Sequence, residues 1–277
     1  MAAAVPRILV DGAAQSCVPA GDRGLSYGDG LFETIRFRGT DAPLWPRHMQ
    51  RLHESCTRLR LPSPDPTVLQ DEARAVVAGL PQSVVRITLT RGSGARGYAP
   101  PPAPKPTRIV AGFELPLLIG DDYRHGIRVR LCQLRLAEQP LLAGMKHLNR
   151  LEQVLARAEW SDPAIAEGLL CDRHERVIGA TMANLFAVIG GVLVTPALDL
   201  CGIAGVARAE ILSVQPAAQV RELKLDELAR ASELFLSSSV RGILPVRELE
   251  DRHYAVGPVT RALQRHWDGL GFSMEAE

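Results

Sequence analysis

The sequence predicts a mixed fold of the α/β or α+β class, divided into two domains. Apolar periods typical of helices and of strands alternate along the chain, and no internal repeat is present. A chain of 277 residues, of which 46% are hydrophobic, can bury two modest cores. We place the domain boundary near residue 121, which gives a smaller N-terminal α+β domain at 1–120 and a larger C-terminal domain at 121–277.

The first domain is predicted to open with a strand in the segment MAAAVPRILVDG. Met49, Leu52 and Cys56 follow one another at steps of three and four residues, which predicts a helix over 48–60 that ends before a group of prolines. Alternating apolar and polar residues over 84–90 predict a strand. The other elements expected here are a helix over 67–79 and a strand over 108–115.

Residues 91–106 can only form a loop, because three glycines are followed by five prolines in a run of seven residues. Gly92, Gly94 and Gly97 fit the pattern G-x-G-x-x-G, but a dinucleotide site also needs a helix to begin there. The prolines exclude that helix, and with it a dinucleotide-binding domain. A flexible lid is one interpretation of the proline-rich part, 99–106.

In the second domain, an alternating strand over 127–131 is expected first. Leu148, Leu151 and Leu155 recur at helical spacing and predict a helix. Gly205 is expected to open another helix, VARAEILSV. The other expected elements are strands around Leu169, Val177, Leu185 and Val192, a helical segment over 225–231, and a strand over 233–236 that enters a serine-rich turn.

Composition and charge exclude several classes of protein. A formal net charge of +1 gives no field that would attract nucleic acid or an acidic membrane surface. No uncharged apolar run approaches the ~20 residues that span a bilayer, and the first residues lack the features of a signal peptide. Five separate cysteines without a C-x-x-C pair are typical of reduced thiols, and the histidines form no metal-binding pattern. We therefore expect a cytoplasmic protein without a metal ion.

Lysine is scarce, and only Lys105, Lys146 and Lys224 occur. An enzyme that forms a Schiff base needs one lysine whose amine is partly neutral in a dry pocket. Lys105 stands between two prolines in the loop, and Lys224 is surrounded by charged residues. Lys146 follows an apolar stretch and precedes a predicted helix, whose positive end would help to lower its pKa. Taken alone, this segment also fits an ordinary lysine at a helix end.

The surroundings of Lys146 resemble those of a known family. The string GMKHLNRLEQVLARAEW resembles the segment that carries the cofactor-binding lysine of aminodeoxychorismate lyases, which are fold-type IV pyridoxal-phosphate (PLP) enzymes of the D-amino-acid and branched-chain aminotransferase superfamily. Further matches run in order from about residue 8 to about residue 247, nearly the whole chain. They are DRGLSYGDGLFETIR, RHMQRLHESCTRL, TRGSGARGY, ANLFAV, CGIAGVARAEIL and FLSSSVRGILPV.

The resemblance implies a two-domain fold-type IV enzyme that binds PLP. Lys146 would bond covalently to the cofactor and then serve as the base that transfers a proton. Arg51 matches the arginine that holds the cofactor phosphate, although its position beside the apolar face of the predicted helix also fits a surface residue. The other phosphate ligands implied are the amides of Val206 and Ala207 at a helix start and the hydroxyl of Ser239.

For the substrate, we expect Arg96 to bind a carboxylate, with Arg91 as the second choice. Tyr27 and Ser238 are further candidates. Ser238 stands in the turn Ser237-Ser238-Ser239 where the lyases have T-N-S, so an asparagine is missing. Gly179 is a second departure, because aminotransferases of this fold carry there a glutamate that pairs with the pyridine nitrogen.

The activity implied is that of a carbon–oxygen lyase acting on 4-amino-4-deoxychorismate. It would release pyruvate and give 4-aminobenzoate for folate biosynthesis. Because the product is aromatic, a weaker electron sink should suffice for this reaction. A D-amino-acid or branched-chain aminotransferase is the alternative within the fold, and a non-catalytic binding or scaffold relative is the alternative from another class. The resemblance also implies a homodimer.

Overall fold

The computed structural model describes residues 7–272, and the chain divides into two compact units. Unit 1 consists of Met1–Pro116 together with Met145–Asn149, and unit 2 consists of Leu117–Gly144 and Arg150–Glu277. Each unit contains strands and helices of its own. The mixed α/β class that the sequence predicts is therefore confirmed.

The first boundary between the units, at Pro116 and Leu117, lies close to the division expected near residue 121. The segment Met145–Asn149 differs from the expectation, because it groups with unit 1 although its neighbours in sequence belong to unit 2. The physical reason is a set of backbone hydrogen bonds to a strand of unit 1. Lys146, which the sequence analysis assigned to the larger C-terminal domain, therefore packs with the N-terminal unit.

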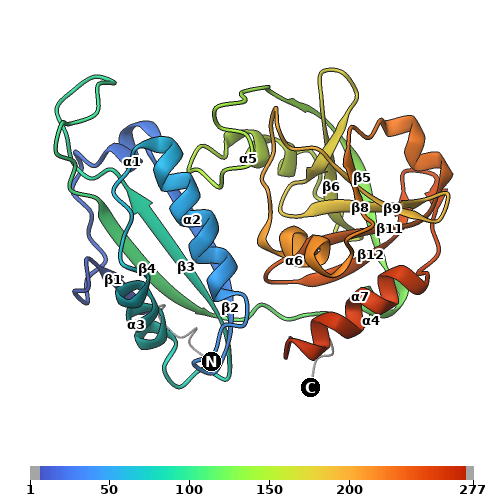
Figure 1. Cartoon of the computed structure of the whole chain (residues 1–277), viewed down its shortest axis with the longest axis horizontal. Helices are drawn as coiled ribbons and strands as arrows, with labels where there is room; N and C mark the ends of the chain where they lie inside the picture. The colour runs from blue at the N-terminus through green and yellow to red at the C-terminus, as the bar shows by residue number, and fades with distance from the viewer. Residues whose placement is uncertain (1–6, 273–277) are drawn as a thin grey trace. The chain divides into compact units, whose positions relative to one another are not determined.

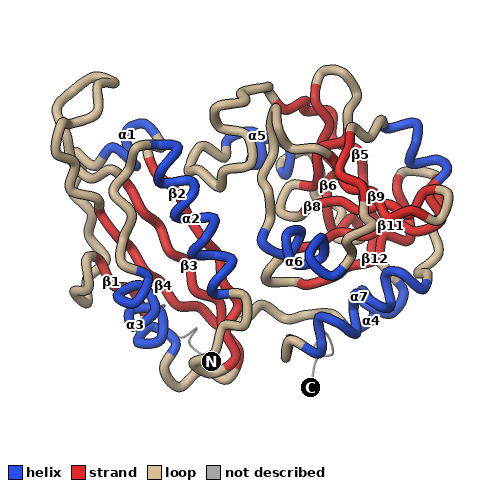
Figure 2. The backbone as a smooth tube through the Cα atoms, in the orientation of Figure 1, coloured by secondary structure: helices blue, strands red, loops and turns tan. Residues whose placement is uncertain are grey.

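Unit 1 is built on an antiparallel sheet whose four strands have the order β1-β4-β3-β2. Helices α2 and α3 pack against this sheet (Figure 1, Figure 2). The core between them contains the fully buried Ile35, Leu69 and Val85. The element bounds are β1 Arg7–Val10, α1 Arg23–Tyr27, β2 Gly30–Arg38, α2 Trp45–Leu59, α3 Pro66–Val77, β3 Gln82–Thr90 and β4 Thr107–Glu114.

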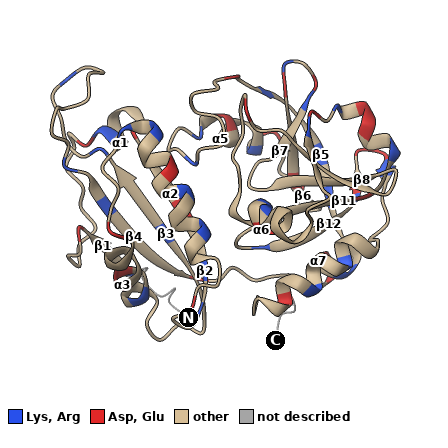
Figure 3. Ribbon diagram, in the orientation of Figure 1, with Lys and Arg blue, Asp and Glu red and all other residues tan. Residues whose placement is uncertain are grey.

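The local sequence explains where the helices of unit 1 begin and end. The Asp65 carboxylate accepts a hydrogen bond from the Thr67 amide at 2.8 Å and caps α3, while Pro66 supplies the fixed φ that a helix start requires. Helix α2 ends at Arg60, whose φ of 51° is left-handed. Acidic and basic side chains are interspersed along α2 (Figure 3), as expected for a helix with one face in water.

Unit 2 contains a curled sheet of nine strands among the described residues, in the order β10-β9-β8-β11-β12-β5-β6-β7, with β13 paired to β12 (Figure 1). Strands β12, β5 and β6 run parallel to their neighbours within this group, and β10 runs parallel to β9. The bounds are β5 Ile127–Leu136, β6 Ile165–Asp172, β7 Val177–Ala180, β8 Asn184–Ile189, β9 Val192–Pro196, β10 Gln219–Arg221, β11 Ala231–Ser238, β12 Gly242–Leu249 and β13 Arg252–His253.

Helices cover parts of the unit 2 sheet, and α7 packs on β11 and β12. Trp267 of α7 is fully buried and stacks on Phe272 with ring centroids 5.6 Å apart. Within residues 7–272, no helix is long and apolar enough to cross a membrane. The bounds are α4 Gly120–His125, α5 Leu151–Arg157, α6 Val206–Val214, the 3₁₀ helix η1 Leu225–Arg230 and α7 Pro258–Gly269.

The loop between β3 and β4 depends on the backbone of Gly92. Its φ is +79°, and a Cβ atom added there would lie 1.8 Å from the carbonyl oxygen of Lys105. The loop therefore returns so close to its own start that only a glycine fits at this position. Gly97 has a similar φ of +98°, but no atom lies within 4 Å of the position that its Cβ would take.

These two glycines allow steric overlap to be separated from backbone strain. We expect G97A to lower the free energy of unfolding by about 1 kcal/mol, because only the left-handed backbone opposes it. We expect G92A to lower it by about 3 kcal/mol or more, because the loop must also move. Urea denaturation of both variants measures the difference, and equal losses would show that the close approach to Lys105 has no energetic weight.

Candidate active site

Lys146 is held at the edge of the unit 1 sheet by the backbone on both sides of it. Its carbonyl accepts a hydrogen bond from the Phe32 amide at 2.9 Å, and the Leu148 amide donates to the Gly30 carbonyl at 3.0 Å. Residues Leu31 and His147 form an antiparallel bridge between these two bonds. The segment thus extends the sheet next to β2. This pairing fixes the position of Lys146 along the strand, opposite Phe32.

The lysine amine lies over an aromatic ring. Nζ of Lys146 is 4.3 Å from the ring centroid of Phe32, within the range of a cation–π contact. Our expectation that a helix dipole acts on Lys146 is wrong, because α5 begins only at Leu151 and a dipole acts within the first turn. The local environment of the amine is set instead by the strand that carries Phe32.

A buried carboxylate lies next to Phe32 in the same strand. Glu33 is 1% exposed and accepts hydrogen bonds from Arg51 and His48. Arg51 Nε lies 2.8 Å from Oε1, and His48 Nδ1 lies 2.6 Å from Oε2. Both partners come from α2, where they stand on one face at a spacing of three residues. Glu33 therefore fixes the guanidinium of Arg51 to the sheet.

The charges of this cluster shift the pKa values of its members. Burial alone would raise the pKa of Glu33, but Arg51 and His48 outweigh it and lower the pKa to about 2. Burial lowers the pKa of His48 and wins over the opposing effect of Glu33, with help from the charges of Arg51 and Lys146. Burial thus favours the neutral form of His48, whose Nδ1 faces the Glu33 carboxylate as the hydrogen-bond donor.

The loop that carries Arg96 is fastened by Arg23. The Arg23 guanidinium, 4% exposed as a residue, donates to the carbonyl oxygens of Gly97, Tyr98 and Ala99 at 2.9 to 3.3 Å. The hydroxyl of Tyr27 accepts a hydrogen bond from the Gly97 amide at 3.1 Å. Arg96 itself is exposed. The structure thus brings Tyr27 to the loop of Arg96, and its part in binding substrate stays a prediction.

Arg91 has a different environment from Arg96. It is 6% exposed, and its Nε donates to Asp29 at 2.8 Å. Its Nη1 and Nη2 donate to the carbonyl oxygens of Arg60 and Leu59 at 3.0 and 2.9 Å, at the end of α2. All three nitrogens of Arg91 are therefore engaged inside unit 1. Of the two arginines considered for a substrate carboxylate, Arg96 is the one with an accessible guanidinium.

In unit 2, helix α6 begins at a tightly built turn. The Gly205 amide donates to Oδ1 of Asn184 at 3.0 Å, and a Cβ on Gly205 would lie 2.1 Å from that oxygen. The next two residues, Val206 and Ala207, are buried, and their amides have no acceptor among residues 7–272. Two buried amides at the positive end of a helix form a site that is complementary to an anion.

The serine turn follows β11, whose residue Ser237 pairs with Asn184 of β8. The hydroxyl of Ser237 is buried without a partner in the described chain, and the Ser238 hydroxyl accepts from the Arg241 amide at 3.1 Å. Ser239 lies in the same turn and is partly exposed. Strand β8 carries Asn184, which positions the start of α6. Because β11 pairs with β8, the serines at the end of β11 lie close to this helix start.

Gly179 lies in β7, opposite Leu170 of β6. A carboxylate is present nearby in this part of the fold, since Glu167 of β6 is fully buried and accepts a hydrogen bond from the Thr181 hydroxyl. Arg241 pairs with the same carboxylate at 2.5 Å. Glu167, Thr181 and Arg241 thus form a cluster on and beside β6, the strand that pairs with β7 of Gly179. The sequence analysis did not predict this cluster.

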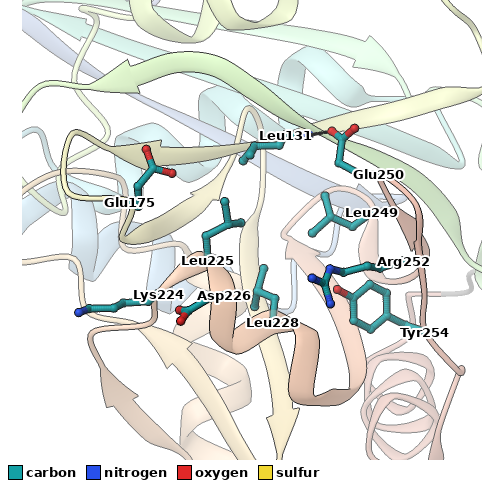
Figure 4. Close-up of a pocket in the computed structure, with 10 residues that line it drawn as sticks. All are labelled: Leu131, Glu175, Lys224, Leu225, Asp226, Leu228, Leu249, Glu250, Arg252 and Tyr254. Carbon is teal, nitrogen blue, oxygen red and sulfur yellow. Dashed lines mark hydrogen bonds between the residues drawn. The ribbon is translucent and has the colours of Figure 1, made fainter.

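A cavity of about 520 Å³ opens elsewhere in unit 2 (Figure 4). Leucine side chains form its apolar walls, and Glu250, Arg252 and Tyr254 line one side. None of the residues expected to bind cofactor or substrate lines this cavity. Within residues 7–272, no group of three or more His, Cys, Asp or Glu side chains could hold a metal ion.

Comparison with known proteins identifies the family. The profile of the family described as amino-transferase class IV matches residues 30–249. The chain belongs to this family. Aminodeoxychorismate lyase of Vibrio harveyi is 35% identical over 263 residues, which cover 92% of this chain and 97% of that protein.

Solved structures agree with this assignment. The crystal structure of 4-amino-4-deoxychorismate lyase from Pseudomonas aeruginosa is 47% identical, covers 96% of this chain and 100% of its own, and superposes with a TM-score of 0.91. Branched-chain amino acid aminotransferase from Escherichia coli is 26% identical and has a TM-score of 0.83, with coverage of 95% and 94%. The two-domain fold-type IV architecture is thus confirmed.

PLP is the cofactor of class IV aminotransferases. This chain has residues that suit the aldehyde of PLP and residues that suit its phosphate. A half-buried lysine amine over Phe32 suits the aldehyde. The unpaired amides of Val206 and Ala207 suit the phosphate. The lysine amine and these two amides are therefore groups of the kinds that bind an aldehyde and a phosphate.

The sequence analysis missed several charged residues that organise the site, namely Glu33, His48, Arg23, Glu167 and Arg241. A partial signal was available for Arg23, Glu33, His48 and Arg241, which lie in the strings that resemble the family. The contact between Glu33 and Arg51, however, joins a strand to a helix 18 residues away. Pairing across such a distance is not encoded in any local period.

The depressed pKa of Glu33 predicts a pH-dependent contribution to stability. A carboxylate whose pKa falls from 4.5 to about 2 on folding stabilises the protein above pH 4.5, and this contribution disappears as the pH falls through 2. At pH 7 we expect E33Q to unfold more easily by about 3 kcal/mol, because Arg51 loses its buried partner. The difference from wild type should shrink below pH 4.5.

Denaturant titrations of wild type and E33Q between pH 7 and pH 2 measure this difference. The control is E54Q, which alters an exposed glutamate of the same helix α2 that accepts only from Gln50. E54Q should stay within about 0.5 kcal/mol of wild type. A wild-type advantage over E33Q that does not depend on pH would contradict the assignment of an ionised Glu33.

The contacts of Arg23 predict how firmly the loop is held. Replacing Arg23 with Met removes three hydrogen bonds to the loop carbonyls, so we expect trypsin to cut after Arg96 about tenfold faster than in wild type. Mass spectrometry of the fragments measures the rate. R124M, which removes only an exposed ion pair with Asp121, should leave the rate unchanged. Equal rates in both variants would mean that Arg23 does not fasten the loop.

Proposed function

We propose that the protein is a PLP-dependent 4-amino-4-deoxychorismate lyase, which converts its substrate into 4-aminobenzoate and pyruvate for folate biosynthesis. The observation that carries this proposal is that the chain is more similar to a lyase of the family than to an aminotransferase of the family. The lyase structure is 47% identical, whereas the branched-chain aminotransferase structure is 26% identical over nearly the same length. The curated lyase relative also spans 92% of the chain.

In this proposal, Lys146 binds the cofactor aldehyde, and the phosphate is held by Arg51, the amides of Val206 and Ala207, and Ser239. Arg51 supplies a planar guanidinium that is complementary to phosphate oxygens, and its ion pair with Glu33 orients it. The helix start supplies two amides without other acceptors. When bound, PLP supplies an electron sink for the bond that breaks at the amine-bearing carbon.

Lys146 is proposed to take the proton from the amine-bearing carbon of the substrate. The contact of its Nζ with the Phe32 ring keeps the amine at a defined position above β2. Loss of this proton and departure of the enolpyruvyl ether oxygen make the ring aromatic. The electrons therefore leave with the ether, and the leaving group takes up a proton to give pyruvate after rearrangement.

Gly179 supports the lyase over a transaminase. A glutamate paired with the pyridine nitrogen keeps that nitrogen protonated and strengthens the electron sink, which transamination requires. The lyase reaction gains its driving force from an aromatic product, so a weaker sink suffices. Replacing Gly179 with Glu would introduce a Cβ that lies 3.0 Å from the Ala183 carbonyl oxygen, so this backbone must shift by a few tenths of an ångström. A large gain in lyase rate for G179E would contradict this explanation.

For the substrate, we propose that Arg96 binds one carboxylate and that Tyr27 and Ser238 are further substrate contacts. Arg96 is exposed on a loop that Arg23 and Tyr27 fasten, so its backbone is fixed while its side chain remains accessible. Arg91, the second choice, has its guanidinium engaged by Asp29 and two carbonyls. We therefore assign Arg91 a supporting part, in which it holds the start of the loop.

A branched-chain or D-amino-acid aminotransferase is the second candidate, favoured by the family description and by the aminotransferase structures with this fold. Incubation with leucine or D-alanine and 2-oxoglutarate tests it, because only a transaminase forms glutamate. Formation of glutamate without 4-aminobenzoate would replace the lyase proposal by this one.

We also propose a homodimer in the cytosol. The five cysteines are all free, and four of them are buried, which is consistent with a reducing compartment. The homodimer is inferred from the resemblance to fold-type IV enzymes alone. Sedimentation velocity at micromolar concentration measures the mass, and a species of 30.1 kDa only would contradict the dimer.

Replacement of Lys146 with Ala tests the proposal directly. Without the amine no covalent bond to the cofactor can form, so the absorbance band that borohydride shifts should be lost. The rate of 4-aminobenzoate formation should fall by a factor on the order of 10⁴, because the base is lost as well. Fluorescence of 4-aminobenzoate and a pyruvate assay measure the two products.

The matched control is K224A, which removes an exposed lysine of unit 2. It should keep the band and the wild-type rate. A K146A protein that retains the borohydride-sensitive band would exclude Lys146 as the site of attachment. Wild-type protein that carries the band but forms no 4-aminobenzoate would exclude the lyase while leaving the cofactor assignment intact.

A further inference from the structure

Arg241 is held firmly by the fold while most of its hydrogen-bond donors remain unused. It lies in the turn between β11 and β12, and its side chain is 25% exposed. Nη2 donates to Oε2 of the fully buried Glu167 at 2.5 Å. Within residues 7–272, neither Nε nor Nη1 of Arg241 has an acceptor. The guanidinium is therefore oriented but not saturated.

The carboxylate behind Arg241 is itself fixed. The other oxygen of Glu167 accepts hydrogen bonds from the Thr181 hydroxyl and from the Gly168 amide, the latter at 3.1 Å. The backbone of Arg241 is fixed too, because its amide donates to Ser238 and its carbonyl accepts from the Tyr123 hydroxyl at 2.6 Å. A side chain that is held at both ends loses little entropy when it binds a ligand.

The residues that precede Arg241 in the chain carry further hydrogen-bond donors. Ser237 and Ser238 end β11, Ser239 begins the turn of Arg241, and the Ser237 hydroxyl is buried without a partner in the described chain. Nη1 lies on the side of Cδ, so Nε and Nη1 do not form a parallel pair, but each can donate one charge-assisted hydrogen bond to an oxygen of a carboxylate or a phosphate. Among the described residues, Glu167 forms the ion pair with Arg241 and occupies one nitrogen only, while Asp122 also lies within electrostatic range of the guanidinium.

We propose that Arg241 binds a carboxylate of the substrate, and that Glu167 is the positioning residue that orients it. This inference rests on the lyase function proposed above. Both products of that reaction are carboxylates, so the substrate carries two negative charges, and each needs a partner when water is excluded. Arg91 is engaged by Asp29 and by two carbonyls, whereas Arg241 keeps Nε and Nη1 without an acceptor among the described residues and can serve one of the two carboxylates.

The cofactor phosphate is a second source of the same anionic chemistry. The two sources predict different results, because a substrate ligand changes KM and a phosphate ligand changes cofactor affinity. The variants are R241M, which removes the charge, and R241K, which keeps a cation for Glu167 but loses the fork of donors. R247M is the matched control, since Arg247 is an exposed arginine of the neighbouring strand β12.

Steady-state rates of 4-aminobenzoate formation are measured for the holoenzymes, together with the Kd for PLP from absorbance titration. We expect R241M to raise KM for the substrate about 10- to 100-fold, with kcat changed by less than about threefold and an unchanged Kd for PLP. R241K should show an intermediate KM, and R247M the wild-type value. E167Q should raise KM less than R241M, because it loosens Arg241 without removing it.

An R241M protein with the KM of R247M would overturn the inference. So would a weakened affinity for PLP at unchanged KM, which would assign Arg241 to the phosphate. Circular dichroism and thermal melting check that each variant is folded. If R241M does not fold, R241K decides, because it retains a cation opposite Glu167, and an R241K protein with the wild-type KM would overturn the inference.

A binding experiment separates this inference from the lyase proposal. Chorismate has a hydroxyl in place of the reacting amine, so it offers the carboxylates without the chemistry. Titration calorimetry should show about 10- to 100-fold weaker binding of chorismate to R241M holoenzyme than to R247M holoenzyme. Wild type that forms no 4-aminobenzoate but shows this difference would refute the lyase function and support Arg241 as a carboxylate ligand. Equal binding to both variants would refute the inference alone.

Discussion

Backbone pairing between β2 and the segment Met145–Asn149 is the constraint on which the rest of the site depends. The hydrogen bonds of Phe32 and Leu148 with Lys146 and Gly30 set the register, and the alternation of side chains in extended chain then decides which ones face the core. A shift of one residue would turn Lys146 to the opposite face. The lysine is therefore placed by the strand of Phe32 and Glu33, and the helix that follows it in sequence has no part in this.

Buried carboxylates that each orient one or two arginines recur through both units. Glu33 orients Arg51, Asp29 orients Arg23 and Arg91, and Glu167 orients Arg241. The chain has many arginines and three lysines, which suits this arrangement, because a guanidinium stays charged when it is buried and holds a fixed geometry. Arg51 and Arg241 thus contribute ion pairs to the fold and are also the arginines that we propose as ligands of anions.

The sequence predicted most of the regular elements, because they carry clear periods. The apolar spacing of α2, the alternation of β3 and the glycine before α6 each specify a local structure that packing does not override. Helix α7 was missed, although its buried Leu263 and Trp267 stand four residues apart. The predicted helix at Leu148 begins at Leu151, since the residues before it are drawn into the pairing with β2.

The candidate site was predictable in part. Lys146, Arg51 and the start of α6 lie in strings that resemble the family, and the roles proposed for them remain those expected from the sequence. The ion pairs of Glu33, Arg23 and Glu167 were not predictable, because each joins elements that are far apart in the chain. Hydrophobic periodicity indicates which face of an element is buried, but it does not indicate which charged side chain of another element lies against that face.

The division of the chain has a consequence for its synthesis. Because the segment of Lys146 completes the edge of a sheet whose other strands all precede Pro116, the N-terminal unit cannot finish folding from its own contiguous stretch as it leaves the ribosome. The edge of β2 therefore stays unpaired until β5, the first strand of unit 2, and the residues up to Asn149 have been synthesised. The residue proposed to bind the cofactor, Lys146, is thus in the last part of that sheet to be synthesised.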